Sequence, residues 1–250
     1  MDGTSRVKTA LAEGKRVALG VWQLLPGSNL ARILARAGYD WVLVDCEHGN
    51  IDDAAMHESV AAVAGYGVSP IVRTESKTAM SSLTVAASRF PPQGRRGFGS
   101  PFAMDRFAVG LTASQYLAQA NATLLLAVPI ETREALDAAD AIAAVDGLDL
   151  LFVGPFDLGN SIGHPVLNGV IDAVLEEAIE KVLRAAHAAG QKAGIYCGDG
   201  AQAKHYAEMG FDLVNVQTDV GALSASLTRE LATVAGTGAS TPGSRGPYGS

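Results

Sequence analysis

Residues 123–157 read TLLLAVPIETREALDAADAIAAVDGLDLLFVGPFD, in which two apolar runs enclose an amphipathic stretch. The apolar runs, Thr123–Ile130 and Leu148–Gly154, have the continuous hydrophobicity of strands that are covered on both faces. The stretch Glu131–Ala144 between them has apolar residues at helical spacing. A strand, a helix and a second strand in this order predict a βαβ unit of a parallel sheet.

The same alternation continues through the rest of the chain. Five further strands are predicted at Val17–Gln23, Trp41–Asp45, Pro70–Arg73, Lys192–Cys197 and Leu213–Gln217. Helical stretches are predicted between the strands at Asn29–Ala37, Asp53–Ala64, Ile171–Ala189 and Gly200–Met209. This pattern predicts an α/β fold of the TIM-type (β/α) barrel class, although it supplies seven strand candidates where such a barrel has eight.

The composition favours one large core. With 250 residues that are 48% hydrophobic and 18% charged, the chain suits a single barrel domain better than two small domains. We expect this domain to span residues 1–235. Residues 236–250 consist largely of Gly, Ser, Thr and Pro, which have little to bury, and we expect this tail to be disordered.

Charge and hydropathy exclude some partners. A net charge of -7 with scattered basic residues opposes binding to nucleic acid. The longest apolar run, Ala122–Ile130, is far shorter than the roughly 20 residues that cross a bilayer, and the first residues lack an apolar signal region. Cys46 and Cys197 do not form a metal pair or a disulfide framework. We therefore expect a cytoplasmic protein with free thiols and no membrane partner.

Polar residues gather where the predicted strands end. Because the carboxyl ends of the strands build the active site of a parallel barrel, these side chains are expected to meet although they are far apart in the sequence. The residues are Asp45, Glu47 and His48 after the second strand, Arg73 at the end of the third, Glu131 after the fourth and Asp157 after the fifth.

Glu131 and Asp157 form a candidate metal site. Two carboxylates at neighbouring strand ends can hold a hard divalent cation that keeps several waters, as Mg²⁺ and Mn²⁺ do. The alternative is that both residues cap the helices that follow them. Gly154, just before Asp157, would let a ligand approach the backbone, and the amides after it could receive a carboxylate.

Three further residues each allow a functional and a structural interpretation. His48 could move protons near neutral pH with Asp45 or Glu47 orienting it, but a lone histidine is more often structural. Arg73 could stabilise a carboxylate or a developing enolate oxygen, or it could form an ion pair at the barrel mouth. Trp22 is expected to pack in the core and to wall the pocket.

Taken together, six motifs resemble the HpcH/HpaI aldolase family in order and spacing from about residue 6 to residue 230, apart from one gap. The motifs are Gly20-Val21-Trp22, Asp45-Cys46-Glu47-His48-Gly49, Ile71-Val72-Arg73, Arg89-Phe90-Pro91-Pro92-Gln93-Gly94-Arg95-Arg96-Gly97, Ile130-Glu131-Thr132-Arg133-Glu134-Ala135 and Gly154-Pro155-Phe156-Asp157-Leu158. Members such as 4-hydroxy-2-oxoheptanedioate aldolase and 2-dehydro-3-deoxyglucarate aldolase cleave hydroxy-2-oxo-acids to pyruvate and an aldehyde.

The resemblance implies a role for each matching residue. Glu131 and Asp157 would hold a divalent metal (Mg²⁺, Mn²⁺ or Co²⁺), and amides around Phe156 and Asp157 would bind the carboxylate of pyruvate. Arg73 would stabilise the charge on the pyruvate oxygen, and His48 would take part in proton transfer. Asp45 and Glu47 would orient His48 and the metal-bound waters. A homo-oligomer with exchanged C-terminal helices is also implied by the resemblance.

The sequence departs from the family pattern at three places. Pro129 stands where the family often has Gln, and Phe156 is bulkier than the Ala often found there. Between Arg73 and Arg89, roughly two dozen residues are missing, about the size of one βα repeat, together with an aspartate that would partner the catalytic histidine. The leading hypothesis is a pyruvate-type aldolase impaired by this gap. A CoA-ester lyase and a catalytically inactive binding protein are the alternatives.

Overall fold

The structure is a computed structural model that describes residues 5–74, 81–99 and 110–236. The predicted disordered tail lies outside these residues, except for Gly236, which ends the last helix with a φ of 64°. Within the described residues, no helix has the length and apolar character that would let it span a bilayer.

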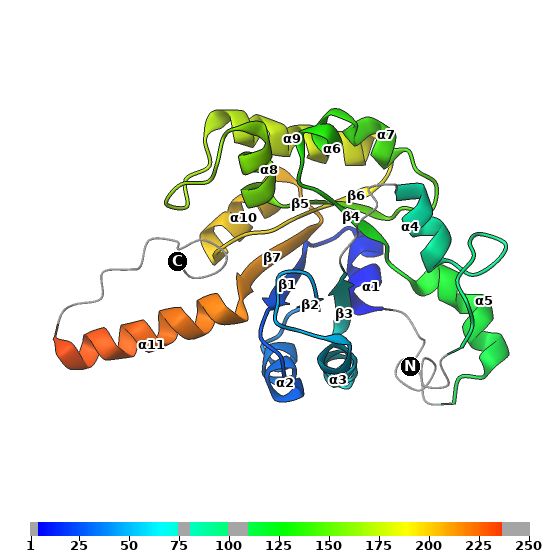
Figure 1. The fold of residues 1–250 in the computed structure, drawn as a ribbon, viewed down its shortest axis with the longest axis horizontal. Coiled ribbons are helices and arrows are strands. Elements are labelled where there is room, and N and C mark those ends of the chain that lie inside the picture. Colours follow the sequence, from blue (N-terminus) through cyan, green and yellow to red (C-terminus); the bar gives the residue numbers. More distant parts are fainter. Residues whose placement is uncertain (1–4, 75–80, 100–109, 237–250) are drawn as a thin grey trace.

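Seven parallel strands form one sheet, as the sequence predicts. The strands are β1 (Ala18–Gln23), β2 (Trp41–Asp45), β3 (Ser69–Arg73), β4 (Ala127–Ile130), β5 (Leu150–Val153), β6 (Lys192–Ile195) and β7 (Leu213–Thr218). Their order is β3-β2-β1-β7-β6-β5-β4, and all neighbouring pairs are parallel. The sheet curls into a half-barrel with helices on its outer side (Figure 1).

The half-barrel is open between β3 and β4. These two strands are consecutive along the chain, yet they stand at opposite ends of the strand order, and the described residues provide no pairing between them. The opening therefore falls where the sequence lacks one βα repeat. A closed barrel needs strand number, tilt and stagger to agree, and seven strands in this arrangement leave two edges.

Eleven helices are found among the described residues. They are α1 (Arg6–Glu13), α2 (Ser28–Arg36), α3 (Asp53–Ala64), α4 (Ser81–Ser88), α5 (Ala113–Thr123), α6 (Arg133–Asp137), α7 (Ala139–Ala143), α8 (Pro155–Ile162), α9 (Ala173–Ala188), α10 (Gly200–Met209) and α11 (Asp219–Ala235). Figure 1 shows α2 and α3 beside β1–β3, and α6, α7 and α9 beside β4–β6.

Two predicted boundaries were wrong for local reasons. The strand predicted from Thr123 begins at Ala127, because α5 starts at a capping box of Thr112 and Gln115 and continues through Thr123. The single helix predicted over Glu131–Ala144 is divided into α6 and α7 at Ala138, which has a φ of -93° and a ψ of 10°.

A recurring Gly-apolar-Asp sequence fixes how neighbouring strands are aligned along their axes at the amino end of the sheet. It precedes β2 (Gly38-Tyr39-Asp40), β5 (Gly147-Leu148-Asp149) and β7 (Gly210-Phe211-Asp212), and each glycine has a positive φ. Each aspartate accepts a hydrogen bond from a backbone N–H at the neighbouring strand, those of Leu19 (3.1 Å), Leu126 (2.8 Å) and Ala193 (3.0 Å) respectively. These bonds fix the strands in relative register and so place their carboxyl ends at one level.

Trp41 fills the interior of the sheet near β1. Its side chain is fully buried, and its indole N–H donates to the carbonyl of Ala18 at 3.1 Å. A Cβ at Gly20 would lie 2.0 Å from the Trp41 ring, so only glycine fits at that position of β1. This packing holds β1 and β2 together.

Candidate functional site

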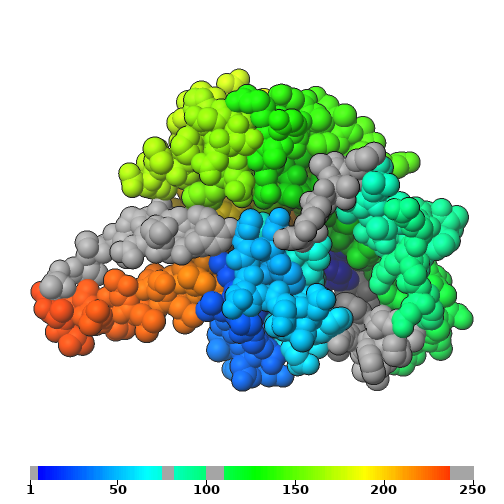
Figure 2. Space-filling view, in the orientation of Figure 1, coloured from blue at the N-terminus to red at the C-terminus, as the bar shows by residue number. Residues whose placement is uncertain are grey.

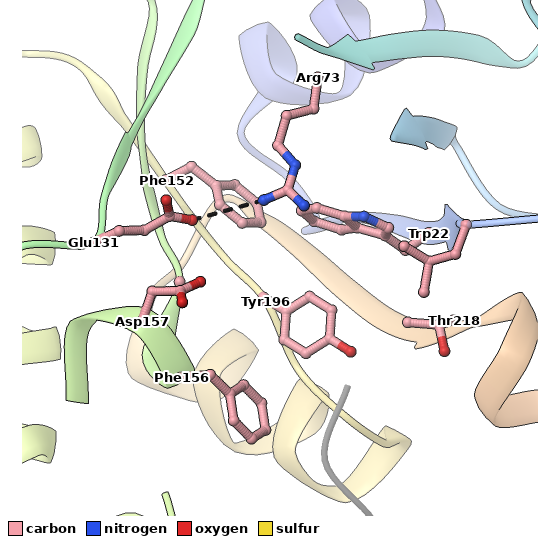
Figure 3. A pocket seen from close by; sticks show the side chains of 10 residues that line it. Trp22, Arg73, Glu131, Phe152, Phe156, Asp157, Tyr196 and Thr218 are labelled. Atoms are coloured by element: carbon pink, nitrogen blue, oxygen red, sulfur yellow. Dashed lines mark ion pairs between the residues drawn. The ribbon is translucent and has the colours of Figure 1, made fainter. Parts of the chain in front are cut away.

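A pocket opens at the carboxyl ends of the strands (Figure 3). Its lining comes from β1, β3, β5 and β7, from the residues that follow β1, β4 and β6, and from the first turn of α8. The lining residues are Trp22, Leu24, Arg73, Glu131, Phe152, Gly154, Phe156, Asp157, Tyr196 and Thr218. The structure thus brings Trp22, Arg73, Glu131, Gly154, Phe156 and Asp157 of the predicted site into one cavity.

Asp45 organises one side of this pocket from beneath. Its buried carboxylate accepts hydrogen bonds from the Trp22 indole at 2.7 Å and from Arg73 Nε at 3.0 Å, and it pairs with a second guanidinium nitrogen of Arg73. It also accepts the backbone N–H groups of Glu47 and His48, both at 2.9 Å. Burial acts to raise the pKa of Asp45, but the hydrogen bonds from Arg73 and Trp22 outweigh it and lower that pKa.

Arg73 connects Asp45 to the pocket. Its guanidinium carbon lies 5.1 Å from the centroid of the Trp22 ring, and its side chain is only 15% exposed. Arg73 Nε lies 3.4 Å from a Glu47 oxygen, and Arg73 Nη1 lies 3.9 Å from a Glu131 oxygen (Figure 3). The structural ion pair considered above is therefore present, and the same guanidinium also faces the predicted metal site.

Glu131 and Asp157 lie on the same side of the pocket (Figure 3). Burial raises the pKa of Glu131 to about 7, and the negative charge of Asp157 adds to this shift. Neither carboxylate accepts a hydrogen bond from the described residues. A Cβ at Gly154 would lie 2.6 Å from Glu131 Oε1, so this glycine makes room for the carboxylate. The two carboxylates therefore carry more negative charge than the described residues around them neutralise.

The helix-cap interpretation of Glu131 is wrong. Thr132 is the N-cap of α6, and its hydroxyl accepts the backbone N–H of Ala135 at 3.1 Å. The N-cap of α8 is Gly154, whereas Asp157 lies within the first turn of that helix. A carboxylate there interacts favourably with the helix dipole, but Glu131 has no such structural role.

The donor set of this pair fits a hard divalent cation. No group of three or more potential metal-ligating side chains occurs in the part of the chain that the structure describes. Mg²⁺ is commonly bound through one or two carboxylates with waters and substrate oxygens completing its octahedron. Glu131 and Asp157 provide this number of ligands and the negative charge that a cation would neutralise.

His48 and Glu47 lie in the loop after β2 and are both exposed. His48 is not among the residues that line the pocket, although its backbone is fixed by Asp45. Glu47 reaches Arg73. The sequence predicts that Arg73 and His48 both face the mouth of the pocket. Of these two residues, Arg73 lines the pocket, and the role of His48 stays a prediction.

Four lining residues were missed by the sequence analysis, namely Leu24, Phe152, Tyr196 and Thr218. Phe152 is in β5, Tyr196 directly follows β6 and Thr218 ends β7, so all three obey the strand-end rule that identified the charged residues. None of these side chains is a charged acid–base or metal-ligating group, which is the signal that marks Arg73, Glu131 and Asp157 in the sequence.

The role of Asp219 is not apparent from the order and spacing of residues in the sequence. This residue begins α11 and is 1% exposed, and its carboxylate accepts the backbone N–H groups of Leu24 at 3.0 Å and Leu25 at 2.9 Å. It thereby fixes the loop after β1 that forms one rim of the pocket.

The sequence model of the HpcH/HpaI aldolase/citrate lyase family matches residues 74–225. The chain belongs to this family. A hydroxypyruvate/pyruvate aldolase from Rhizorhabdus wittichii is 35% identical to it, over 91% of this chain and 98% of that protein. A 5-keto-4-deoxy-D-glucarate aldolase from Escherichia coli is 31% identical, over 91% of this chain and 95% of that protein. These enzymes are aldolases, which supports the aldolase hypothesis and not its alternatives.

A protein of the same family also has a similar fold. A crystal structure of a family protein from Burkholderia cenocepacia J2315 superposes with a TM-score of 0.79 at 30% identity, covering 93% of this chain and all (100%) of that one. The prediction of a family barrel with seven strands is thus confirmed.

The number of aligned positions indicates how many residues this chain lacks relative to a family member. The alignment with the Rhizorhabdus wittichii protein has 251 positions but takes in 91% of a 250-residue chain, which is about 228 residues. About 23 of its positions therefore have no residue in this chain. This shortfall matches the roughly two dozen residues expected to be missing after Arg73, about the size of a βα repeat.

Proposed function

We propose that this protein is a metal-dependent aldolase that cleaves hydroxy-2-oxo-acids to pyruvate and an aldehyde and also runs the reverse addition. The decisive observation is the acidic pair Glu131 and Asp157, which lacks hydrogen-bond donors among the described residues and faces the guanidinium of Arg73. The names of the aldolase relatives support the same reaction class.

The first turn of α8 offers a place for the carboxylate of pyruvate. Pro155 at the start of this helix has no N–H group, and the amides of Phe156 and Asp157 follow it. The first amides of a helix have no partner within the helix, and their dipole favours an anion. We assign these two amides to the pyruvate carboxylate, next to the acidic pair.

Glu131 and Asp157 would hold Mg²⁺, Mn²⁺ or Co²⁺. The bound cation supplies Lewis acidity, which makes the methyl group of pyruvate more acidic. Arg73 presents its guanidinium to the oxygen on which negative charge develops, and Asp45 and Trp22 hold this guanidinium in one plane. We assign the transfer of the methyl proton to His48, whose backbone is held by the same Asp45 carboxylate.

Helix α11 supports a homo-oligomer. It projects from the rest of the fold (Figure 1), and its orange surface extends well beyond the body of the molecule (Figure 2). Leu223, Leu227, Leu231 and Val234 are 46%, 70%, 71% and 88% exposed, and their spacing puts them on one face. We propose that this apolar face packs on a second copy of the chain.

The free cysteines Cys46 and Cys197 suit a reducing compartment such as the cytoplasm.

The proposal is tested by pyruvate release from a panel of hydroxy-2-oxo-acids, with Mg²⁺, Mn²⁺ or Co²⁺ and after chelation. Chelation and Glu131→Gln should each abolish most of the release, because both remove the cation. Glu134→Gln, at an exposed position of α6, is the matched control and should leave release unchanged. Release that survives both chelation and Glu131→Gln would overturn the proposal. Binding of pyruvate and metal without any release would identify the inactive binding protein instead.

A further inference from the structure

Aromatic rings form a continuous wall in the pocket. The ring centroids of Trp22 and Phe152 are 5.7 Å apart, those of Trp22 and Tyr196 are 5.3 Å apart, and those of Phe156 and Tyr196 are 6.0 Å apart. Trp22 and Tyr196 are 5% and 8% exposed, so their positions are fixed by packing. The wall is therefore present before any ligand binds.

The wall offers few polar groups to a ligand. The indole N–H of Trp22 already donates to Asp45, and the Thr218 hydroxyl accepts the backbone N–H of Gly221 at 2.9 Å. Figure 3 shows Tyr196 and Phe156 on the side of the pocket away from Arg73. A ligand that extends from the acidic pair along this wall meets mainly aromatic carbon, together with the hydroxyl of Tyr196.

The charges of the site are concentrated around Arg73. Among the described residues that line the pocket, Arg73 is the only cationic side chain, and it already has carboxylate partners in Asp45, Glu47 and Glu131. Together with Asp157, which lines the same pocket and lies close enough to Glu131 to raise its pKa, the site holds four carboxylates and one guanidinium. A bound divalent cation would leave this group net negative, and the carboxylate of pyruvate would add to the negative charge. Among the lining residues that the structure describes, a second substrate carboxylate would find no free counter-charge.

We infer that the aldehyde partner of this enzyme is an uncharged aldehyde with an apolar or aromatic body, and that Phe156 and Tyr196 select it against semialdehydes bearing a second carboxylate. The inference rests on the proposed aldolase function and specifies its second substrate. In the addition, the methyl carbon of pyruvate loses a proton and bonds to the aldehyde carbon. The carbonyl π bond breaks, and the new alkoxide takes up a proton. Cleavage is the reverse.

The acceptor preference is measured by competition. Pyruvate, metal and enzyme are supplied with equal concentrations of phenylacetaldehyde and succinic semialdehyde, and the initial rates of the two adducts are compared. We expect the phenylacetaldehyde adduct to form at least about 10-fold faster, the lower end of what an apolar pocket discriminates. Equal rates, or a preference for the semialdehyde, would overturn the inference.

A second measurement separates this inference from the proposed function. Exchange of the pyruvate methyl protons for deuterium, without any aldehyde, reports the first half of the reaction alone. Exchange together with a preference for the semialdehyde would refute the acceptor inference and leave the aldolase standing. If exchange and adduct formation are both absent, the proposed function fails and the acceptor inference falls with it.

Variants of Phe156 test which residue makes the selection, since this partly exposed ring can be replaced while its backbone amide is kept. Phe156→Arg supplies the missing cation and should shift the adduct ratio at least about 10-fold toward succinic semialdehyde. Phe156→Leu keeps an apolar side chain and should retain the preference for phenylacetaldehyde. Deuterium exchange is measured in both variants, and the adduct ratio carries the result because it compares two products of the same variant at the same pyruvate site. An unchanged ratio in an exchange-competent Phe156→Arg protein would contradict the assigned role of Phe156.

Discussion

Trp22 and Arg73 bind the same carboxylate, that of Asp45, and also stack on each other, with the guanidinium carbon 5.1 Å from the indole centroid. The two side chains come from β1 and β3, which both flank β2, the strand that ends at Asp45. The orientation of Arg73 is therefore set by three strands together. This arrangement explains why the guanidinium of Arg73 has a fixed orientation although β3 is an edge strand.

Arg73→Lys should lower pyruvate release by about 100-fold, the cost of errors near 1 Å in an active site. A lysine ammonium cannot contact two oxygens of Asp45 and face Glu131 in one plane. Initial rates at saturating metal would measure the loss. Arg16→Lys, at the Asp40 ion pair on the opposite rim, is the control and should retain activity. Undiminished release by the Arg73→Lys protein would show that the planar fork is not needed.

Gly154→Ala should weaken metal activation by at least about 10-fold, because the added Cβ would come within 2.6 Å of Glu131 Oε1 and displace the carboxylate. The dependence of pyruvate release on Mn²⁺ concentration gives the apparent affinity. Gly200→Ala is a matched control, since a Cβ there meets no atom within 4 Å. The same activation curve for wild type and Gly154→Ala would argue against Glu131 as a ligand.

Asp212→Asn should destabilise the fold by about 1–3 kcal/mol at pH 7, the range expected when a buried hydrogen-bonding group loses its partner. Burial acts to raise the pKa of Asp212, but hydrogen bonds from the Ala193 N–H, His187 and Lys192 outweigh it and lower that pKa. A lowered pKa stabilises the fold above the unfolded value near 3.9, and this stability is lost as the pH falls through the folded value.

The difference in unfolding free energy between wild type and Asp212→Asn should therefore shrink from pH 7 to pH 3. Urea unfolding at several pH values would measure it. Asp137→Asn, exposed on α6, serves as the control. A difference that stays constant over this range would show that the charge of Asp212 contributes nothing.

Inserting a family-like βα repeat after Arg73 should raise both stability and turnover, because it would pair the edges of β3 and β4 that no described strand covers. We expect a rise in melting temperature of at least about 3 °C, the shift given by ~1 kcal/mol in a domain of this size. Pyruvate release should increase as well, since the family pattern implies that the inserted repeat would carry an aspartate beside His48. Equal melting temperature and equal turnover would defeat the idea that the missing repeat matters.

Leu227→Glu should convert the oligomer to a smaller species, because the charge would have to be buried in the proposed contact of α11. Light scattering on a sizing column would give the mass. Ala225→Glu, an exposed position on the other face of α11, is the control and should leave the mass unchanged. A wild-type protein that runs as a monomer would refute the proposed interface directly.

Much of the fold and part of the site could be predicted because their signals are local. Alternating apolar and amphipathic stretches marked all seven strands, and the strand-end rule brought Arg73, Glu131 and Asp157 to one rim. The missing repeat was visible as a short interval between two motifs. These features need only the order and spacing of residues along the chain.

Other features depend on contacts between distant segments. Asp219 binds the backbone of Leu24, 195 residues away. The aromatic wall joins Trp22 of β1, Phe152 of β5 and Tyr196, which follows β6. Nor could the sequence choose whether Asp45 would orient His48 or the pair Trp22 and Arg73. The sequence determined which residues end the strands, since periodicity is a property of neighbours along the chain. The curvature of the sheet decided which of those ends touch, because packing in three dimensions sets that curvature.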